Sequence, residues 1–295
     1  MQQRRGLRTG PAETVQLKDA GGRWVATFTE GAYTVAMAGP ARTFTEPRVS
    51  PVVAHKVWIR TLPLPFSGNV DAGWMEYARR ANRRKYPDVL ALAMQYVRGA
   101  PPFFEGQVQI AGDASYGPLV GGEREEGADF NDYLGVKWTY REGVDKPEKR
   151  QFRCLDCSGF MRMVWGYRPH LPGDTYPSVV PLCLKPQRSR KAMPRRAFEI
   201  CKWGPGVLVV EDAGVQVEDF SRIGIGDLVF FDADPNDGSQ IDHVGMYLGR
   251  DSTGHHRFVS SRKRADGPTM GDLGGKSILD GTSDFAKAFR AVRRI

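Results

Sequence analysis

The sequence predicts an α+β protein in which a cysteine-bearing helix packs on an antiparallel sheet, with a β-rich region before them. The first observation is CLDCSGFMRMVWGY at 154–167, whose apolar residues have helical spacing. The second is a group of short apolar runs late in the chain, GDLVFFD, DHVGMYLG and HRFVSS, which are separated by turns. The third is a series of β-like runs between Val15 and Leu62, broken by Gly and Pro.

Composition narrows the class of protein. The 295 residues are 41% hydrophobic and 26% charged, which is typical of a globular chain. The net charge of +8 favours an anionic partner or surroundings, such as an anionic cell envelope. Its basic residues are dispersed and carry no nucleic-acid-binding signature, so we expect no nucleic-acid partner. No run of about 18 apolar residues occurs, so no transmembrane segment is expected, and MQQRRGLRTGPAE is not a secretory signal.

The pattern divides the chain into two regions. Residues 1–85 are predicted as a β-rich region with a helix at Asp71–Lys85, and a binding or regulatory role is the expectation for it. Residues 86–295 are predicted as the main domain, with a Pro-rich, basic insertion at about 168–205. Within that domain, residues 103–150 are rich in Gly, Asp and Glu and predict long loops.

Two further segments complete the prediction of the elements. Asp88–Arg98 has helical spacing and is stopped by GAPP. The final segment, FAKAFRAVRRI, predicts either a closing strand or a short helix.

Cys154 and Cys157 form a CxxC pair that has several possible uses. Zinc binding requires a second pair of ligands, but Cys183 and Cys201 stand alone. A thioredoxin-like motif requires a βαβ pattern, but antiparallel strands follow here. We therefore interpret Cys157 as a nucleophile at the first turn of a helix, where free N–H groups and the helix dipole are expected to lower the pKa of a thiol and to bind an oxyanion. Cys154 is interpreted as a core thiol.

A cysteine nucleophile needs a base, because an ordinary thiol is only slightly ionised at neutral pH. Of the five histidines, His243 is the best placed, at the start of a predicted strand and directly after Asp242.

Three motifs in order, DCSGF, GDLVFFD and DHVGMYLG, resemble the NlpC/P60 family of papain-like cysteine peptidases, which cut peptide stems of bacterial cell walls. The resemblance covers roughly residues 150–262, and FRAVRRI resembles the last strand of the family. It implies a papain-like NlpC/P60 core, with Cys157 as nucleophile and His243 as general base. It also implies that Asp156 and Ser158 hold the free amine of the stem peptide; Asp156 is in addition a candidate helix N-cap.

The third catalytic position departs from the family pattern. The family usually has His, Asn or Gln there, and Ser260 stands at the matching place. Ser260 is the predicted third residue, with His255 or His256 as alternatives. The family has an aromatic residue that borders the substrate site, and Tyr140 is predicted to be its counterpart and to bind substrate. Trp138 and Tyr116 are alternatives, and plain packing is the other interpretation of all three aromatics.

The resemblance implies a hydrolase that cleaves amide bonds in cell-wall peptide, next to D-glutamate, through a thioester, and that needs no metal or cofactor. The expected location is secreted or cell-wall associated, with the cytoplasm as the alternative. Two other functions stay open: transfer of the acyl group to another acceptor or amidase action on a non-wall substrate, and wall binding with weak catalysis. A Cys154–Cys157 disulfide that silences the enzyme and a Cys183–Cys201 bridge are further hypotheses.

Overall fold

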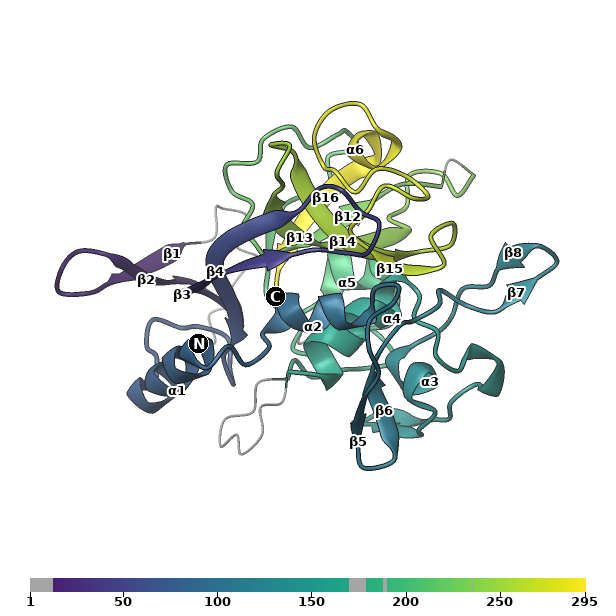
Figure 1. Cartoon of the computed structure of the whole chain (residues 1–295), viewed down its shortest axis with the longest axis horizontal. Coiled ribbons are helices and arrows are strands. Elements are labelled where there is room, and N and C mark those ends of the chain that lie inside the picture. The colour runs from purple at the N-terminus through teal and green to yellow at the C-terminus, as the bar shows by residue number, and fades with distance from the viewer. Residues whose placement is uncertain (1–12, 170–178, 188–189, 235) are drawn as a thin grey trace, which may run out of the picture.

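The computed structural model describes residues 13–169, 179–187, 190–234 and 236–295. The predicted N-terminal region and the predicted insertion therefore lie partly outside the described residues. Figure 1 shows a mixed helix and sheet architecture with two main sheets, one from each end of the chain.

The N-terminal sheet is a four-stranded antiparallel meander in the order β1-β2-β3-β4. Its strands are β1 (Thr14–Lys18), β2 (Trp24–Thr29), β3 (Thr34–Phe44) and β4 (Val53–Thr61). Helix α1 (Ala72–Arg83) begins at Asp71, whose side chain accepts a hydrogen bond from the Trp74 N–H. Trp74 packs with Phe28 and Val35 in a separate hydrophobic cluster, so α1 covers this sheet. The predicted β-rich N-terminal region is confirmed.

The C-terminal sheet has six antiparallel strands in the order β11-β16-β12-β13-β14-β15. They are β11 (Val207–Val210), β12 (Leu228–Phe231), β13 (His243–Arg250), β14 (His256–Arg262), β15 (Gly267–Thr269) and β16 (Phe289–Arg294). Strand β12 is apolar throughout because both faces of the sheet are covered. Leu228 and Phe230 belong to the main core cluster, whereas Val229 and Phe231 belong to a second cluster on the other face. Since α6 (Asp284–Ala288) directly precedes β16, the last segment contains both a helix and a strand.

Helix α4 (Cys157–Arg162) is the predicted nucleophile helix, and it continues as the π-helix η3 (Met163–Tyr167). The Asp156 side chain caps it by accepting a hydrogen bond of 2.7 Å from the Gly159 N–H. The helix contacts β13 and β14. Gly159 permits close packing on the preceding segment, since a Cβ there would lie 2.2 Å from the Ala128 carbonyl oxygen. The predicted packing of this helix on the antiparallel sheet is observed.

The segment 103–150 is more structured than predicted. It holds three short hairpins: β5 (Phe103–Glu105) with β6 (Val108–Ala111), β7 (Leu119–Val120) with β8 (Glu123–Arg124), and β9 (Trp138–Tyr140) with β10 (Gly143–Asp145). It also holds α3 (Phe130–Leu134), which begins with a capping box, and the 3-10 turn η2 (Lys149–Gln151). The expectation of long loops is wrong here because strands of two to four residues are too short to show a periodic pattern.

Two other helices lie in the main domain. The predicted helix at 88–98 is α2 (Val89–Ala93) followed by the 3-10 turn η1 (Met94–Tyr96). Helix α5 (Ala197–Trp203) lies in the second half of the predicted insertion and contacts β12, β13 and β16. None of the helices in the described ranges is both long and apolar enough to cross a membrane.

The two sheets are joined through backbone contacts. The Thr34 N–H donates to the Ile295 carbonyl, and the Ser252 N–H donates to the Val52 carbonyl. Val53 also belongs to the main core cluster that includes the residues of α4. The N-terminal sheet is therefore packed onto the C-terminal half of the chain, and the boundary at residue 86 stays a prediction.

Candidate active site

Cys157 is the first residue of α4, and its sulfur lies against the open edge of β13. The thiol Sγ is 3.9 Å from the Asp242 carbonyl oxygen, and the Val244 N–H donates a hydrogen bond to the sulfur. Strand β14 pairs with β13 only from Met246 onward, so the sulfur takes the place of a ladder partner. The fold thus places Cys157 against the two residues on either side of His243.

The Cys157 thiol is buried, and its environment opposes ionisation. Burial raises the pKa of this thiol well above its usual range, and the Asp156 carboxylate raises it further. The Val244 N–H and Arg195 act in the opposite direction with smaller effect. The expectation of a lowered thiol pKa is therefore wrong for this structure, because desolvation outweighs the contribution of a helix of six residues.

The His243 ring lies among aromatic side chains of the second core cluster. Its centroid is 5.2 Å from that of Phe285 and 5.8 Å from that of Phe231. The Nε2 atom is buried without a hydrogen-bond partner among the described residues. Burial, and to a smaller extent the Arg262 charge, lower the pKa of His243 to about 3. No hydrogen bond joins this ring to Cys157 in the described part of the chain, so the structure brings the two residues near each other but does not couple them.

Ser260, the predicted third residue, contacts an arginine. Its Oγ accepts a hydrogen bond of 3.0 Å from Arg262 Nε. Met246 pairs with Val259, and when this register is continued Arg262 lies opposite His243 while Ser260 lies diagonal to it. The structure therefore shows a cation beside His243 where the prediction has a hydroxyl partner, and the role of Ser260 stays a prediction.

The two alternative histidines are engaged elsewhere. His255 Nδ1 lies 2.8 Å from an Asp280 carboxylate oxygen. His256 Nδ1 lies 2.7 Å from the Tyr247 hydroxyl, and its ring stacks on Phe220. Neither ring has a hydrogen bond or an aromatic contact with His243 among the described residues.

Asp156 and Ser158, the predicted amine-binding pair, are bridged by Arg195. The arginine Nη2 donates to Asp156 Oδ2 at 2.7 Å, while Nη1 donates to Asp156 Oδ1 at 3.2 Å and to Ser158 Oγ at 2.7 Å. Arg195 comes from the second half of the predicted insertion, and its side chain is 15% exposed. Its charge keeps the pKa of the buried Asp156 carboxyl below the ordinary value against the effect of burial. The substrate role of the pair stays a prediction.

Tyr140 lies in an ionic cluster next to this site. Its hydroxyl accepts a hydrogen bond of 2.6 Å from Arg162, whose side chain is fully buried. Arg162 also binds the Asp129 carboxylate at 3.0 Å. The structure thus gives Tyr140 a partner inside the protein, and its predicted role in substrate binding stays untested.

The comparisons with known proteins bear on this region. Residues 137–267 match the model of the NlpC/P60 family. The chain contains an NlpC/P60 domain. Members of this family are generally cysteine peptidases that act on cell-wall peptides. A search of curated proteins found no match.

One similar solved structure is described as similar to a lipoprotein of the NLP/P60 family, from Staphylococcus aureus subsp. aureus Mu50. The two chains are 20% identical with a TM-score of 0.27, and the alignment covers 56% of this chain and 38% of the other.

Within the NlpC/P60 domain, the match runs from the residue before β9 to the first residue of β15 and includes Cys157, His243 and Ser260. It leaves Tyr116 outside, although this residue is close to Cys157. Burial raises the pKa of the Tyr116 hydroxyl, and the nearby Cys157 raises it further. Its hydroxyl donates to Glu126 at 3.2 Å. Of the two tyrosine candidates, Tyr116 is the one for which Cys157 is among the main causes of the pKa shift.

Trp138, the third aromatic candidate, is a packing residue of the NlpC/P60 domain. Its ring packs edge-on against Phe130 at 5.1 Å and against Tyr167 at 5.8 Å.

All four cysteines are described, and all four are free and buried. The structure therefore shows neither the Cys154–Cys157 nor the Cys183–Cys201 disulfide. The Cys154 thiol contacts the Phe152 carbonyl at 3.7 Å, and burial raises its pKa to about 11. This environment is that of a core thiol.

Three carboxylates, one of them on Asp242 beside Cys157, are close enough together to hold a cation. Oxygen atoms of Asp232, Asp237 and Asp242 lie within 4.8 Å of one another. Asp242 already accepts hydrogen bonds from the backbone N–H groups of Ala233 and Asp234. Burial, with a smaller contribution from the two neighbouring carboxylates, raises the pKa of Asp242 to about 6. Oxygen ligands of this type suit Ca²⁺ or Mg²⁺, but the cluster alone assigns no metal.

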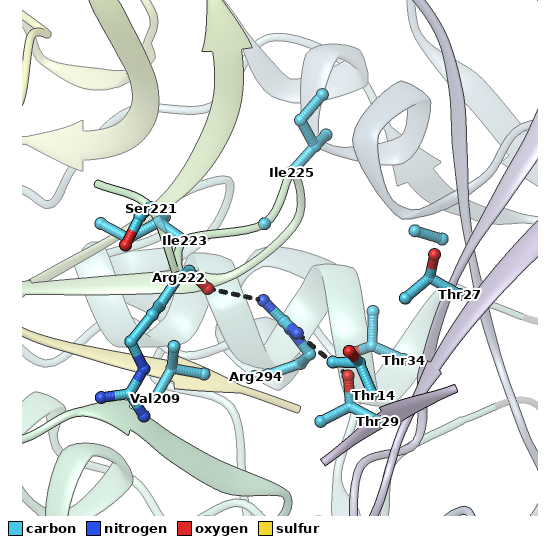
Figure 2. A pocket seen from close by; sticks show the side chains of 12 residues that line it. Thr14, Thr27, Thr29, Thr34, Val209, Ser221, Arg222, Ile223, Ile225 and Arg294 are labelled. Atoms are coloured by element: carbon cyan, nitrogen blue, oxygen red, sulfur yellow. Dashed lines mark hydrogen bonds between the residues drawn. The ribbon is translucent and has the colours of Figure 1, made fainter. Parts of the chain in front are cut away.

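A cavity of about 400 Å³ lies where the N-terminal sheet meets the C-terminal sheet. Figure 2 shows Arg294 in its centre, between Thr29 of β2 and the backbone of Arg222. Arg294 also forms an ion pair of 2.8 Å with Asp227. None of the residues that line this cavity is a predicted site residue, so it is separate from the Cys157 site.

Four charged residues of the site were not found from the sequence: Asp129, Arg162, Arg195 and Arg262. Arg162 gave a weak signal, because it interrupts the apolar helix that follows Cys157. Arg195 gave none, since it lies in the basic run QRSRKAMPRR, which is typical of a solvated surface.

Proposed function

We propose that this protein is a cysteine peptidase or amidase that hydrolyses amide bonds in the peptide stems of the bacterial cell wall, next to D-glutamate. The observation that supports this best is Cys157 at the start of α4, with its sulfur against the residues that flank His243, inside an NlpC/P60 domain. The expected partner is therefore a stem peptide, and the expected location is outside the cytoplasm.

In the proposed reaction, His243 takes the thiol proton and the sulfur of Cys157 attacks the amide carbon. The backbone N–H of Cys157 is one expected donor to the oxyanion. The carbon–nitrogen bond then breaks, His243 returns the proton to the leaving amine, and water hydrolyses the thioester. Because no hydrogen bond joins the His243 ring to the sulfur among the described residues, the proposed reaction requires this ring to turn toward Cys157.

The electrostatics describe a resting site in which both groups are neutral. The pKa of His243 is lowered to about 3 and that of Cys157 is raised, so at neutral pH Cys157 is a thiol and His243 is an unprotonated imidazole. Forming the thiolate–imidazolium pair is therefore costly until a substrate changes the surroundings.

A second candidate function is wall-peptide binding with weak catalysis. It is favoured by two observations on the described residues: Nε2 of His243 is buried without a hydrogen-bond partner there, and the Ser260 hydroxyl contacts Arg262.

Digestion of purified cell-wall stem peptides with the wild type, Cys157→Ala and His243→Ala separates the two candidates. The peptidase proposal expects cleavage by the wild type and loss of cleavage in both variants, because the two residues act as a unit. Tight binding of stems without cleavage by any of the three proteins supports the second candidate.

A further inference from the structure

The Asp156 carboxylate is fully occupied by groups of the protein itself. It accepts hydrogen bonds from the N–H groups of Gly159 and Gly127, from the Ser158 hydroxyl, and twice from Arg195. A carboxylate offers about four lone-pair positions, so these five donors leave no capacity for another. Asp156 directly precedes Cys157, and a group bound to its carboxylate would therefore lie beside the reacting sulfur.

Arg195 is held in this position by a buried network. Arg162 Nη1 donates to the carbonyl oxygens of Cys183 and Met193, at 2.9 and 2.7 Å, and so holds Met193, which lies two residues before Arg195. Met193 is held further by a parallel bridge to Leu182. Asp129 binds Arg162 at 3.0 Å and lies 3.6 Å from Arg195 Nε. The arginine is therefore a fixed part of the site.

A substrate ammonium group would have to replace this guanidinium. The replacement would break a bidentate, charge-assisted contact and would expel a cation from a position that is only 15% exposed. A substrate without a cation at this place has no such cost, because Asp156 is already neutralised.

We propose that Arg195 is a specificity-determining residue, which supplies the cation for Asp156 and Ser158 and restricts the enzyme to acyl donors that bring no ammonium group beside the scissile bond. Peptides whose amino group is acylated or joined in an amide link are the substrate class. This inference rests on the proposed function, in which Cys157 is the nucleophile.

The test uses two short stem peptides that differ only in a free or an acetylated amino terminus. The wild type is expected to cleave the acetylated peptide with a kcat/KM at least about tenfold higher. The ratio of kcat/KM for the acetylated peptide to kcat/KM for the free-amine peptide is expected to fall at least about tenfold in Arg195→Ala. The fall is expected chiefly from a lower KM for the free-amine peptide. Arg195→Lys keeps a cation and is expected to retain the preference for the acetylated peptide. Arg196→Ala, at the exposed next residue, removes the same charge and is expected to leave the ratio unchanged.

Because Arg195→Ala leaves Asp156 without a cation, a second variant guards against misfolding. Asp156→Asn/Arg195→Gln removes both charges and is expected to abolish the discrimination between the two peptides. A wild-type preference for the free amine, or a ratio that is the same in all variants, overturns the inference.

Binding of both peptides to Cys157→Ala gives a readout that does not need turnover. Tighter binding of the acetylated peptide to Cys157→Ala, with the preference reversed in Cys157→Ala/Arg195→Ala, supports the inference. This result supports it even if the wild type cleaves neither peptide and the proposed function fails. Cleavage of both peptides by the wild type with no preference in either assay supports the proposed function and overturns the inference alone.

Discussion

Arg195 Nη2 lies 2.7 Å from Asp156 Oδ2, so a side chain from a region with no expected role in the site neutralises the residue next to Cys157. The contact links two segments that are far apart in sequence, and Arg162 supports it by holding Met193, two residues before Arg195. The charge balance of the site is therefore set by buried arginines and their carboxylate partners, since Cys157 and His243 are both neutral at rest.

Removal of Arg162 should destabilise the fold strongly. Arg162→Ala leaves the buried Asp129 without its closest cation and leaves the Cys183 and Met193 carbonyls without this donor, so we expect a loss of about 3–5 kcal/mol. The free energy of unfolding in urea measures it. Arg83→Ala is the matched control, because its ion pair with Glu76 is exposed and contributes at most about 1 kcal/mol. Equal losses in the two variants would contradict the structural role given to Arg162.

The Cys157 thiol should react slowly at neutral pH. Since burial raises its pKa, alkylation by iodoacetamide is expected to be slow at pH 7. The rate is expected to increase only when the pH exceeds the pKa of an ordinary thiol, about 8.5. Mass spectrometry of proteolytic peptides follows the modification. The modified peptide that is absent in Cys157→Ala is the one that carries Cys157. Fast alkylation of wild-type Cys157 at pH 7, without substrate, would show that the resting site already holds a thiolate.

The Arg262 charge should hold down the pKa of His243. Burial and this charge together lower the pKa to about 3, so Arg262→Gln is expected to raise it while His243 stays buried. Nuclear magnetic resonance titration of the histidine ring protons measures the shift. Arg264→Gln serves as the control, because that arginine is exposed. An unchanged His243 titration in Arg262→Gln would mean that burial alone accounts for the shift.

The raised pKa of Asp242 has a defined consequence for stability. Its pKa is about 6 in the folded protein and about 3.8 unfolded, so between these values the folded state binds more protons and stability falls as the pH rises. Asp242→Asn keeps an oxygen for the Ala233 and Asp234 N–H groups and removes the charge. We expect its Tm to exceed that of the wild type at pH 7, with the difference closing near pH 4.

Asp234→Asn provides the control for this measurement. The pKa of Asp234 is lowered by its hydrogen bonds to Asn236, so its charge is favoured in the folded state and its removal should give no gain in Tm at pH 7. If Asp242→Asn also gives no gain at pH 7, the burial of the Asp242 charge is not a cost to the fold.

Helix α4 and the central strands could be predicted because their signals are local. Phe160, Met161 and Val164 repeat at helical spacing and are all fully buried, and β12 and β13 are apolar runs bounded by Gly, Asp and His. The hairpins of residues 103–150 were missed because each strand is too short for a pattern.

The charged side of the site could not be predicted, because it depends on contacts between distant segments. Arg195 is one of many basic residues in its run, and its place on Asp156 depends on the fold of the segment around Met193, which Arg162 holds. In the same way, the alternation of β14 does not reveal that the Arg262 charge acts on His243, since this depends on how β14 is aligned with β13.

The most direct test of the central claim is mass spectrometry of cell-wall stem peptides after digestion with the wild type and with Cys157→Ala. The account predicts cleaved stems with the wild type alone, and the fragment masses then identify the bond that is cut. Equal cleavage by Cys157→Ala, or stems that stay intact with the wild type, would contradict the assignment of Cys157 as the nucleophile of a cell-wall peptidase.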